Sequence, residues 1–281
     1  MKKVKVKIPA KINLSFDIVG VSGKFHLINS LVASCGIYDA ITLSARKDRE
    51  VTLKEKGIKA GCSVTENNAY KTAKAFIETF GTCGVDIVIN KKIPVGGGMG
   101  GSSADIAGVL KGMQLLYGKD YDIYPLAERL GSDVTYMLKG GYAVMTGKGD
   151  NVESVGVFTT LHIVAIFGEN TVTAGQAYGG FDKLGLSGGN CTNNAVKMLM
   201  QGDIESLAKG LENCLYPVSV EYCPEMATAI TDLENAGAIK GIMTGSGSTV
   251  FGIFNDKKQA KNAEKLLKKK YGKRVKYTTT V

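Results

Sequence analysis

Glycine and serine residues crowd one segment of this 281-residue chain, from Pro94 to Asp105, in an arrangement suited to binding phosphate. Glycines let backbone N–H groups turn toward one point, and oxygen atoms can approach because no Cβ stands in the way. The segment opens into an apolar helix pattern, and a helix N-terminus adds unpaired N–H donors and a positive dipole end. Ser102 and Ser103 could bind phosphate or magnesium there. The segment therefore predicts a phosphate loop, in which we expect the Gly98 backbone to approach phosphate with a positive φ.

Other interpretations of this loop fit less well. A Walker A loop that begins at Gly96 would need a lysine where Ser102 stands. Gly96, Gly98 and Gly101 fit the G-x-G-x-x-G pattern of dinucleotide-binding folds, but Asn90 to Val95 separate the pattern from the strand that should precede it directly. A flexible connector would not explain glycines that end at a well-formed helix start. A nucleotide triphosphate loop of another type remains.

Other side chains capable of chemistry indicate less when they are taken singly. Asp133 stands at an expected helix start, where an acidic residue complements the positive helix end. His162 lies inside the apolar run Leu161 to Ile166, which is typical of a core or sheet-edge residue. His26 is a lone histidine and Lys11 is one lysine in a basic protein. None of these residues identifies a site by its local sequence.

Hydrophobic periodicity predicts the elements that would position these residues. Alternation at Val4 to Ile8 and at Val85 to Ile89 indicates strands. Helical spacing from Ala69 to Phe80 and from Ser103 to Tyr117 indicates two helices, each followed by a glycine, Gly81 or Gly118, that we expect to be left-handed.

The rest of the chain mixes the same two patterns. A glycine-rich, turn-prone stretch runs from Gly179 to Asn190, Ala195 to Met200 has amphipathic spacing, and Thr249 to Phe254 has strand character. We expect an α+β protein with one half at residues 1–150 and a second half at residues 151–281.

Composition limits the partners. The formal net charge of +9 favours anionic ligands, but much of the excess positive charge lies in a C-terminal segment. In that segment an apolar helical face is marked by Ala260, Ala263, Leu266 and Leu267. The lysines of the segment therefore indicate a solvated helix surface rather than a nucleic-acid patch. No apolar run reaches the roughly 18 residues that span a bilayer, and the N-terminus lacks the pattern of a signal peptide. We therefore expect a cytoplasmic protein with no membrane partner.

The six scattered cysteines favour free thiols over a zinc site or a disulfide framework.

Three segments, in order, resemble the motifs of the GHMP kinases, the superfamily of galactokinase and of homoserine, mevalonate and phosphomevalonate kinases. They are Pro9 to Leu14, Pro94 to Asp105, and Gly241 to Phe251. The resemblance implies a two-domain α+β fold, with a ribosomal-protein-S5-like N-terminal domain that holds ATP and an α+β C-terminal domain that binds substrate. The active site would lie in the cleft between them.

The resemblance also implies roles for individual residues. Asp133 would be the general base that takes the substrate hydroxyl proton, and Lys11 would keep its carboxylate ionised. Asn13 would bond the substrate, Phe25 and His26 would recognise cytosine, and Tyr178 would offer a second stacking face. The ATP-binding residues would be Pro94, Val95, Gly96, Gly97, Gly98, Met99, Gly100, Gly101, Ser102, Ser103 and Ala104.

The expected activity is that of an ATP-dependent kinase acting on a hydroxyl of a cytidine-diphosphate sugar alcohol in isoprenoid biosynthesis, with Mg²⁺ accompanying ATP. Further similarity to such kinases lies in Gly23 to His26, Leu130 to Leu138 and Gly147 to Asp150. The alternatives are a homoserine, mevalonate or shikimate type of GHMP kinase, or a non-catalytic RNA-binding module suggested by the pI near 9.1. The metal ligands are undetermined, the assembly is expected to be a monomer or homodimer, and no nucleic acid is expected as a partner.

Overall fold

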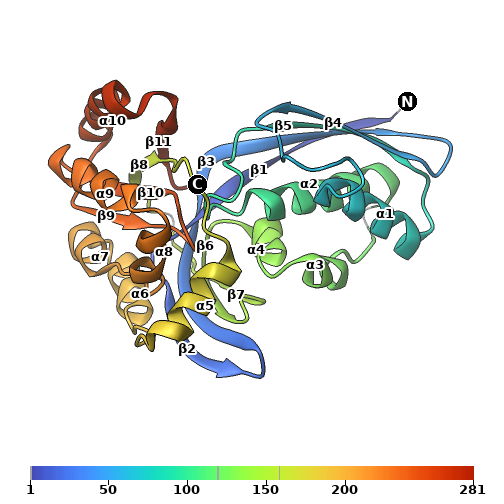
Figure 1. Cartoon of the computed structure of the whole chain (residues 1–281). Helices are drawn as coiled ribbons and strands as arrows, with labels where there is room; N and C mark the ends of the chain where they lie inside the picture. Colours follow the sequence, from blue (N-terminus) through green and yellow to red (C-terminus); the bar gives the residue numbers. More distant parts are fainter. Residues whose placement is uncertain (1, 119, 158) are drawn as a thin grey trace. The chain divides into compact units, whose positions relative to one another are not determined.

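The chain forms two compact units in the computed structural model, which describes residues 2–118, 120–157 and 159–281 (Figure 1). One unit contains the chain up to Ala10, Ile37–Val95 and Gly100–Gly140, and the other contains Lys11–Gly36, Gly96–Met99 and Gly141–Val281. Two long strands, β1 (Lys3–Asn13) and β3 (Phe25–Ala45), contribute residues to both units. The units are therefore built from interleaved stretches of sequence, and each is described by itself below.

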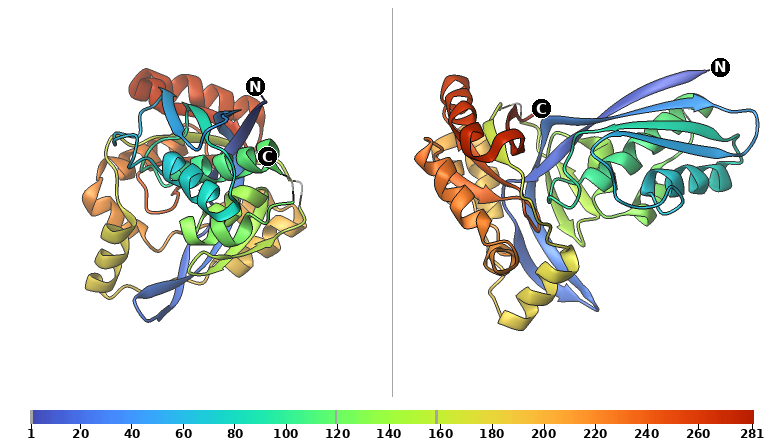
Figure 2. Two further views of the ribbon diagram at one scale, coloured as in Figure 1. Left: turned by 90° about the vertical axis from the view of Figure 1, so that its right-hand side faces the viewer. Right: turned by 45° about the horizontal axis from the view of Figure 1, so that its top comes forward.

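The first unit is a sheet with helices packed beside it. Strand β5 lies between its parallel partner β4 and its antiparallel partner β3, with Val85 opposite both Val51 and Ala45. Helix α1 contacts β4 and α2, and α2 contacts α3 and α4 (Figures 1 and 2). The elements after β3 are β4 (Val51–Gly57), α1 (Asn68–Phe80), β5 (Val85–Lys91), α2 (Gly101–Tyr117), α3 (Tyr124–Leu130) and α4 (Val134–Lys139).

The helix ends of this unit test the predicted boundaries. Asn67 caps α1 by accepting a hydrogen bond from the backbone N–H of Ala69, and Gly81 ends the helix in the left-handed region with φ 68°. Both predicted helices are confirmed. Gly118 ends α2 with φ 171°, which is extended backbone, so the prediction of a second left-handed end was wrong. The N–H of Gly118 still bonds to the Gln114 carbonyl, which closes the last turn without a left-handed residue.

The second unit contains the first half of β3, which pairs with β6 and β2, and a separate antiparallel sheet of order β11-β8-β10-β9. Helices α9 and α10 pack against that separate sheet. The elements are β2 (Asp17–Ser22), β6 (Tyr142–Gly147), β7 (Asn151–Ser154), β8 (His162–Ile166), α5 (Ala174–Leu184), α6 (Thr192–Gln201), α7 (Ile204–Gly210), α8 (Tyr216–Tyr222), α9 (Glu225–Asn235), β9 (Lys240–Met243), β10 (Val250–Phe254), α10 (Lys257–Tyr271), a 3₁₀ turn (Gly272–Arg274) and β11 (Val275–Thr279).

Most sequence-based predictions for this unit are confirmed, with two corrections. The stretch from Gly179 is not a turn throughout, because α5 continues to Leu184. The capping box of Thr173 with Gln176 starts this helix, and Gly180 lies where a Cβ would come within 2.3 Å of Val218. On α10, Leu266 is 53% exposed and does not belong to the buried face.

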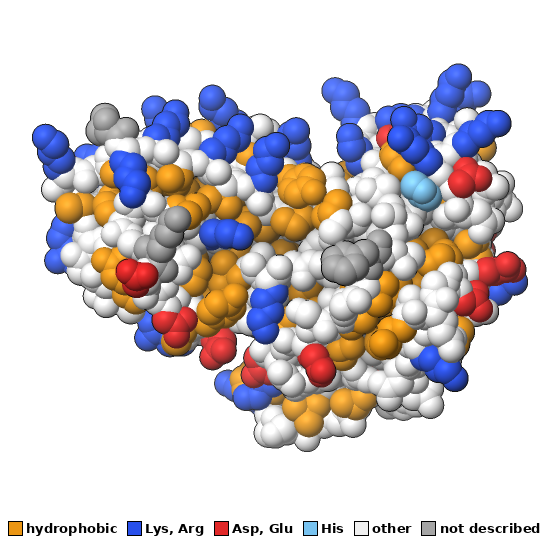
Figure 3. All heavy atoms as spheres, turned by 180° about the vertical axis from the view of Figure 1, so that it is seen from behind, with side chains coloured by type: hydrophobic (Ala, Val, Ile, Leu, Met, Phe, Trp, Pro, Cys, Tyr) orange, Lys and Arg blue, Asp and Glu red, His pale blue; other side chains and the backbone are white. Residues whose placement is uncertain are grey.

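The surface chemistry of α10 agrees with a solvated helix. Its seven lysines are exposed while Ala260, Ala263 and Leu267 are buried, and Figure 3 shows many Lys and Arg side chains standing out from the surface. His162 bonds through Nδ1 to the Tyr277 hydroxyl at 3.0 Å within the neighbouring sheet, as expected of a structural histidine. Among the described residues, no helix has the length and apolar character needed to cross a membrane.

Candidate active site

Residues of the three predicted motifs contact one another within the second unit. The backbone N–H of Lys11 donates to the carbonyl of Met99 at 3.1 Å, and that of Asn13 donates to the Thr244 hydroxyl at 2.9 Å. The same hydroxyl lies 3.4 Å from the Gly98 carbonyl oxygen. Segments far apart in sequence therefore meet at one point, as a shared site requires.

Lys11 and Asn13 form a buried polar pair at this point. Their exposed fractions are 6% and 2%, and the Lys11 amine donates to Asn13 Oδ1 at 2.5 Å. Asn13 in turn donates from Nδ2 to the Ser30 hydroxyl at 2.8 Å. The Asn13 side chain thus orients the Lys11 amine, while its predicted contact with substrate stays a prediction.

The tip of the glycine loop packs against the third motif. Gly98 has φ 73°, as expected, but a Cβ built there would lie 2.1 Å from the Thr244 carbonyl oxygen. Protein backbone therefore already excludes a side chain at Gly98, and the expected approach of phosphate to the Gly98 backbone stays a prediction. A bulky residue at this position would disturb the packing whether or not ATP binds.

The end of the loop leads into α2, within the first unit. Gly100 precedes the helix in the left-handed region with φ 71° and has no side chain to cap it, and Ser102 and Ser103 lie in the first turn. Ser102 Oγ accepts a hydrogen bond from Asn68 Nδ2 at 2.5 Å. Hydroxyls and N–H groups at the start of a long helix are chemically suited to the phosphates of ATP.

Asp133 immediately precedes α4, as the sequence predicted. It has φ −78° and ψ −10°, and its side chain makes no capping hydrogen bond, so helix capping does not account for this aspartate. Asp133 belongs to the first unit and Lys11 to the second. Their action as a catalytic pair remains a prediction.

His26 lies in an aromatic and acidic cluster of the second unit. Its ring stacks on Tyr178 with centroids 4.7 Å apart and planes at 14°, and it meets the edge of Phe181 at 6.2 Å. Its Nε2 lies 2.7 Å from Oδ1 of Asp182. The structure thus brings His26 and Tyr178 together, whereas Phe181 and Asp182 were missed because their part of α5 was interpreted as a turn.

Phe25 precedes His26 on β3. Because successive side chains of a strand point to opposite faces, Phe25 lies apart from the His26 cluster. It is 44% exposed, and the Nζ atoms of Lys148 and Lys24 lie 4.4 and 5.4 Å from its ring centroid. Lys148 lies in the Gly147 to Asp150 tract, so sequence reasoning identified its segment without identifying the cation. Both ammonium groups lie over the ring itself, so the charge there favours an anionic ligand, while stacking of a base on Phe25 stays a prediction.

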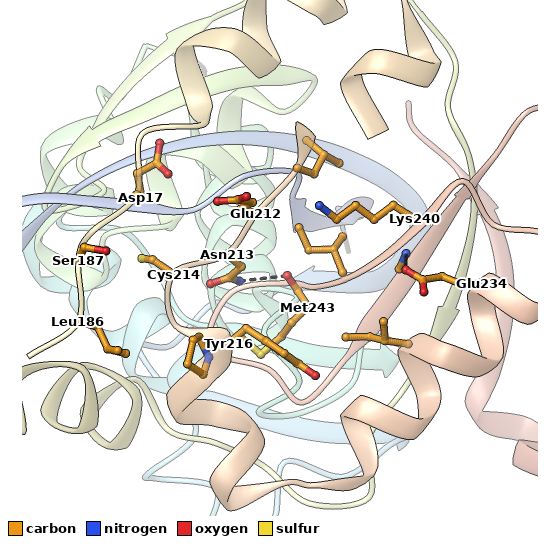
Figure 4. Close-up of a pocket in the computed structure, with 16 residues that line it drawn as sticks. Asp17, Leu186, Ser187, Glu212, Asn213, Cys214, Tyr216, Glu234, Lys240 and Met243 are labelled. Carbon is orange, nitrogen blue, oxygen red and sulfur yellow. Dashed lines mark hydrogen bonds between the residues drawn. The ribbon is translucent and has the colours of Figure 1, made fainter. Parts of the chain in front are cut away.

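A cavity of about 510 Å³ lies elsewhere in the second unit. Figure 4 shows it between Leu186, Tyr216, Glu234 and Met243, and the residues that line it include none of the predicted site residues. Asn213 on its wall donates hydrogen bonds to the carbonyls of Met243 and Gly245, at 3.0 and 2.9 Å. Asn213, which lines the cavity, therefore holds the main chain of the third motif, Gly241 to Phe251.

A preformed metal centre is not evident in the part of the chain that the structure describes. There, no three or more His, Cys, Asp and Glu side chains gather in a way that could hold a metal ion. None of the six cysteines, all of which the structure describes, forms a disulfide bond.

Family models match both halves of the chain. The model described as the GHMP kinases N terminal domain matches residues 67–146, and the one described as GHMP kinases C terminal matches residues 195–273. Together with the relatives below, these matches show that the chain belongs to the GHMP kinase family, and they confirm the predicted two-domain α+β fold. The exact division at residue 150 stays a prediction.

Curated relatives match along almost the whole chain. The 4-diphosphocytidyl-2-C-methyl-D-erythritol kinase of Clostridium tetani is 32% identical over 276 residues, covering 95% of this chain and 97% of the relative. The enzyme of the same name from Desulfitobacterium hafniense is 36% identical over 260 residues, covering 89% and 87%.

Solved structures agree with this similarity. A crystal structure of 4-(cytidine 5'-diphospho)-2C-methyl-D-erythritol kinase matches with a TM-score of 0.84 and 26% identity, and the match covers 98% of each chain. A homoserine kinase from Cytophaga hutchinsonii matches with a TM-score of 0.77 and 18% identity, covering 100% of this chain and 95% of that one, which shows a shared fold alone.

Proposed function

We propose that this chain uses ATP to phosphorylate the 2-hydroxyl of 4-diphosphocytidyl-2-C-methyl-D-erythritol in non-mevalonate isoprenoid biosynthesis. The observation that carries the proposal is the near full-length match to curated kinases of that name at 32% and 36% identity. It favours this substrate over those of the homoserine, mevalonate and shikimate kinases. We place the reaction in the cytoplasm.

The residues support a division of labour for this reaction. Phosphoryl transfer depends chiefly on positioning, charge neutralisation and orientation of the attacking hydroxyl. We assign Asp133 as the base for the 2-hydroxyl proton and Lys11, held by Asn13, as the cation that favours the ionised carboxylate. His26, Tyr178 and Phe25 would recognise the cytidine end.

The segment Pro94 to Ala104 would hold ATP through its backbone and the first turn of α2. The Ser102 and Ser103 hydroxyls are hard oxygen donors of the kind Mg²⁺ accepts together with phosphate oxygens and water. That mode of binding needs no cage of protein carboxylates, which fits the residues present around α2. Magnesium would neutralise charge on the phosphates of the bound nucleotide.

His26→Ala tests the proposed cytidine site. Loss of a base-edge partner and of the ring stacked on Tyr178 should weaken binding by about 1 to 3 kcal/mol, so KM for the cytidine substrate should rise about five- to 150-fold. KM for ATP should stay within about twofold of wild type. Steady-state kinetics with each substrate varied in turn measures both constants.

His162→Ala is the matched control, because the other histidine bonds Tyr277 in a sheet that has no assigned role in cytidine recognition. It should leave both KM values near wild type. An unchanged kcat/KM for the cytidine substrate in folded His26→Ala would remove His26 from the substrate site.

A further inference from the structure

A buried charge cluster joins the two stems of the glycine loop in the first unit. It consists of Asp39 on β3, Lys91 at the end of β5 and Asp105 in α2. The side chains of Lys91, Asp39 and Asp105 are 2%, 0% and 7% exposed. None of these three residues belongs to the proposed catalytic, ATP-binding or substrate-binding residues.

The Lys91 amine uses three hydrogen-bond donors within this cluster. It donates to Asp39 Oδ2 at 2.8 Å, to Asp105 Oδ2 at 2.5 Å and to the Gly101 carbonyl at 3.1 Å. An ammonium group has three donors, so its capacity is filled. One of the three bonds fixes main chain at the start of α2, where the loop ends.

Asp39 fixes the other stem. Its Oδ1 accepts hydrogen bonds from the backbone N–H groups of Lys92 and Ile93, at 2.5 and 2.9 Å, just before the loop begins at Pro94. The Asp39–Lys91 pair therefore connects main chain before the loop with main chain after it. Between these stems Gly96, Gly98 and Gly100 all have positive φ, so the loop contains residues with wide conformational freedom.

Stability alone gives a weak reason for such a cluster. Replacement of a whole buried ion pair by apolar side chains is often neutral or stabilising, because burial removes the charges from water. Here the charges hold backbone groups on both sides of one loop, which is a geometric task that apolar side chains would not perform.

We propose that Asp39, Lys91 and Asp105 are positioning residues that set the spacing of the glycine-loop stems for ATP, without touching the nucleotide. The inference rests on the proposed assignment of Pro94 to Ala104 as the ATP loop. It adds three residues that act on ATP binding through the backbone.

The raised pKa of the Asp105 carboxyl points to a conservative substitution at this position. Burial and the nearby Asp39 carboxylate, opposed by Lys91, raise the pKa of Asp105 to about 7. Its Oδ1 is buried and has no hydrogen-bond partner among the described residues. Because burial disfavours the charged carboxylate, Asp105→Asn, which is neutral and similar in shape, is the mildest of the changes to this cluster.

The test compares KM for ATP with KM for the cytidine substrate in Asp39→Asn, Asp105→Asn and the double variant Asp39→Asn/Lys91→Met. The double variant removes Asp39 and the cation Lys91 together and leaves Asp105, whose raised pKa favours the protonated form, so its fold should survive better than after loss of Lys91 alone. KM for ATP should rise at least about tenfold in Asp39→Asn and the double variant, and about threefold in Asp105→Asn, because small misplacements of binding groups are costly. KM for the cytidine substrate should stay within about twofold.

Asp86→Asn is the matched control. Asp86 also lies on β5 and forms an ion pair with Arg46 at 2.7 Å, but this pair is partly exposed and away from the loop stems. Its loss should leave both KM values unchanged, since exposed pairs contribute little.

Ser103→Ala distinguishes failure of the positioning role of the cluster from failure of the ATP-loop assignment. If it raises KM for ATP while folded cluster variants do not, the positioning role is wrong and the ATP loop stands. If neither Ser103→Ala nor the cluster variants change KM for ATP, the loop assignment fails and the positioning role fails with it. Loss of the fold in all three cluster variants would make the cluster a stability element and would also overturn the proposal.

Discussion

Asp133→Asn lowers kcat by at least about 10² while the melting temperature hardly changes, if Asp133 is the general base. A positioned base typically supplies about 10² to 10⁴ in rate, and asparagine keeps the size of the side chain without its basicity. The wild-type side chain makes no capping hydrogen bond to α4, so its replacement removes no helix cap. Steady-state kinetics and thermal unfolding of the same preparation measure both quantities.

Asp122→Asn is the appropriate comparison. Asp122 lies just before α3 in the same unit and accepts a hydrogen bond from the backbone N–H of Tyr124 at 3.1 Å. This variant should lose a little stability and no activity, the reverse of the Asp133 result. A near-normal kcat in Asp133→Asn would eliminate Asp133 as the base.

Lys11→Met should lower kcat by about 10² to 10³, the loss seen when a group that stabilises transition-state charge is removed from an enclosed site. The Lys11 amine is buried against Asn13 Oδ1 at 2.5 Å, so it is held in one place. Lys7→Met, on an exposed position of the same strand, is the control and should retain full activity.

The double variant Lys11→Met/Asp133→Asn tests whether the two residues act as a unit. Groups that work together in catalysis are strongly non-additive, so the double variant should be little slower than the worse single variant. Losses that multiply would mean that Lys11 acts independently of Asp133, and the proposed pairing would be withdrawn.

Local patterns predicted the elements wherever one signal dominated. Asn67 before an apolar repeat and Gly81 after it bracket α1, and both behave as expected. The helix α5 was missed because Gly179 and Gly180 suggested a turn, while the capping box of Thr173 with Gln176 was the stronger signal. Gly180 is explained by its closeness to Val218, a long-range contact that the sequence does not display.

The candidate site likewise has features that the sequence predicted and features that only the structure shows. The loop could be predicted because its glycines are nearly contiguous, whereas its contact with Thr244 required the structure. The buried charge cluster of Asp39, Lys91 and Asp105 could not be predicted from the sequence. Lys91 lies 52 residues from Asp39 and 14 from Asp105, and no sequence pattern links them. The contact of Gly98 with the Thr244 carbonyl also required the fold, because glycine is compatible with close approach by any group.

The most direct test of the proposed function is ADP release by the wild-type protein with different acceptors at fixed Mg²⁺ and ATP. We expect kcat/KM for 4-diphosphocytidyl-2-C-methyl-D-erythritol to exceed that for the same alcohol without cytidine, and for homoserine and mevalonate, by at least about 10², because unpaired polar groups in a site disfavour an analogue that lacks their partners. RNA should not stimulate ADP release. Equal or faster turnover of an acceptor without cytidine would contradict the account.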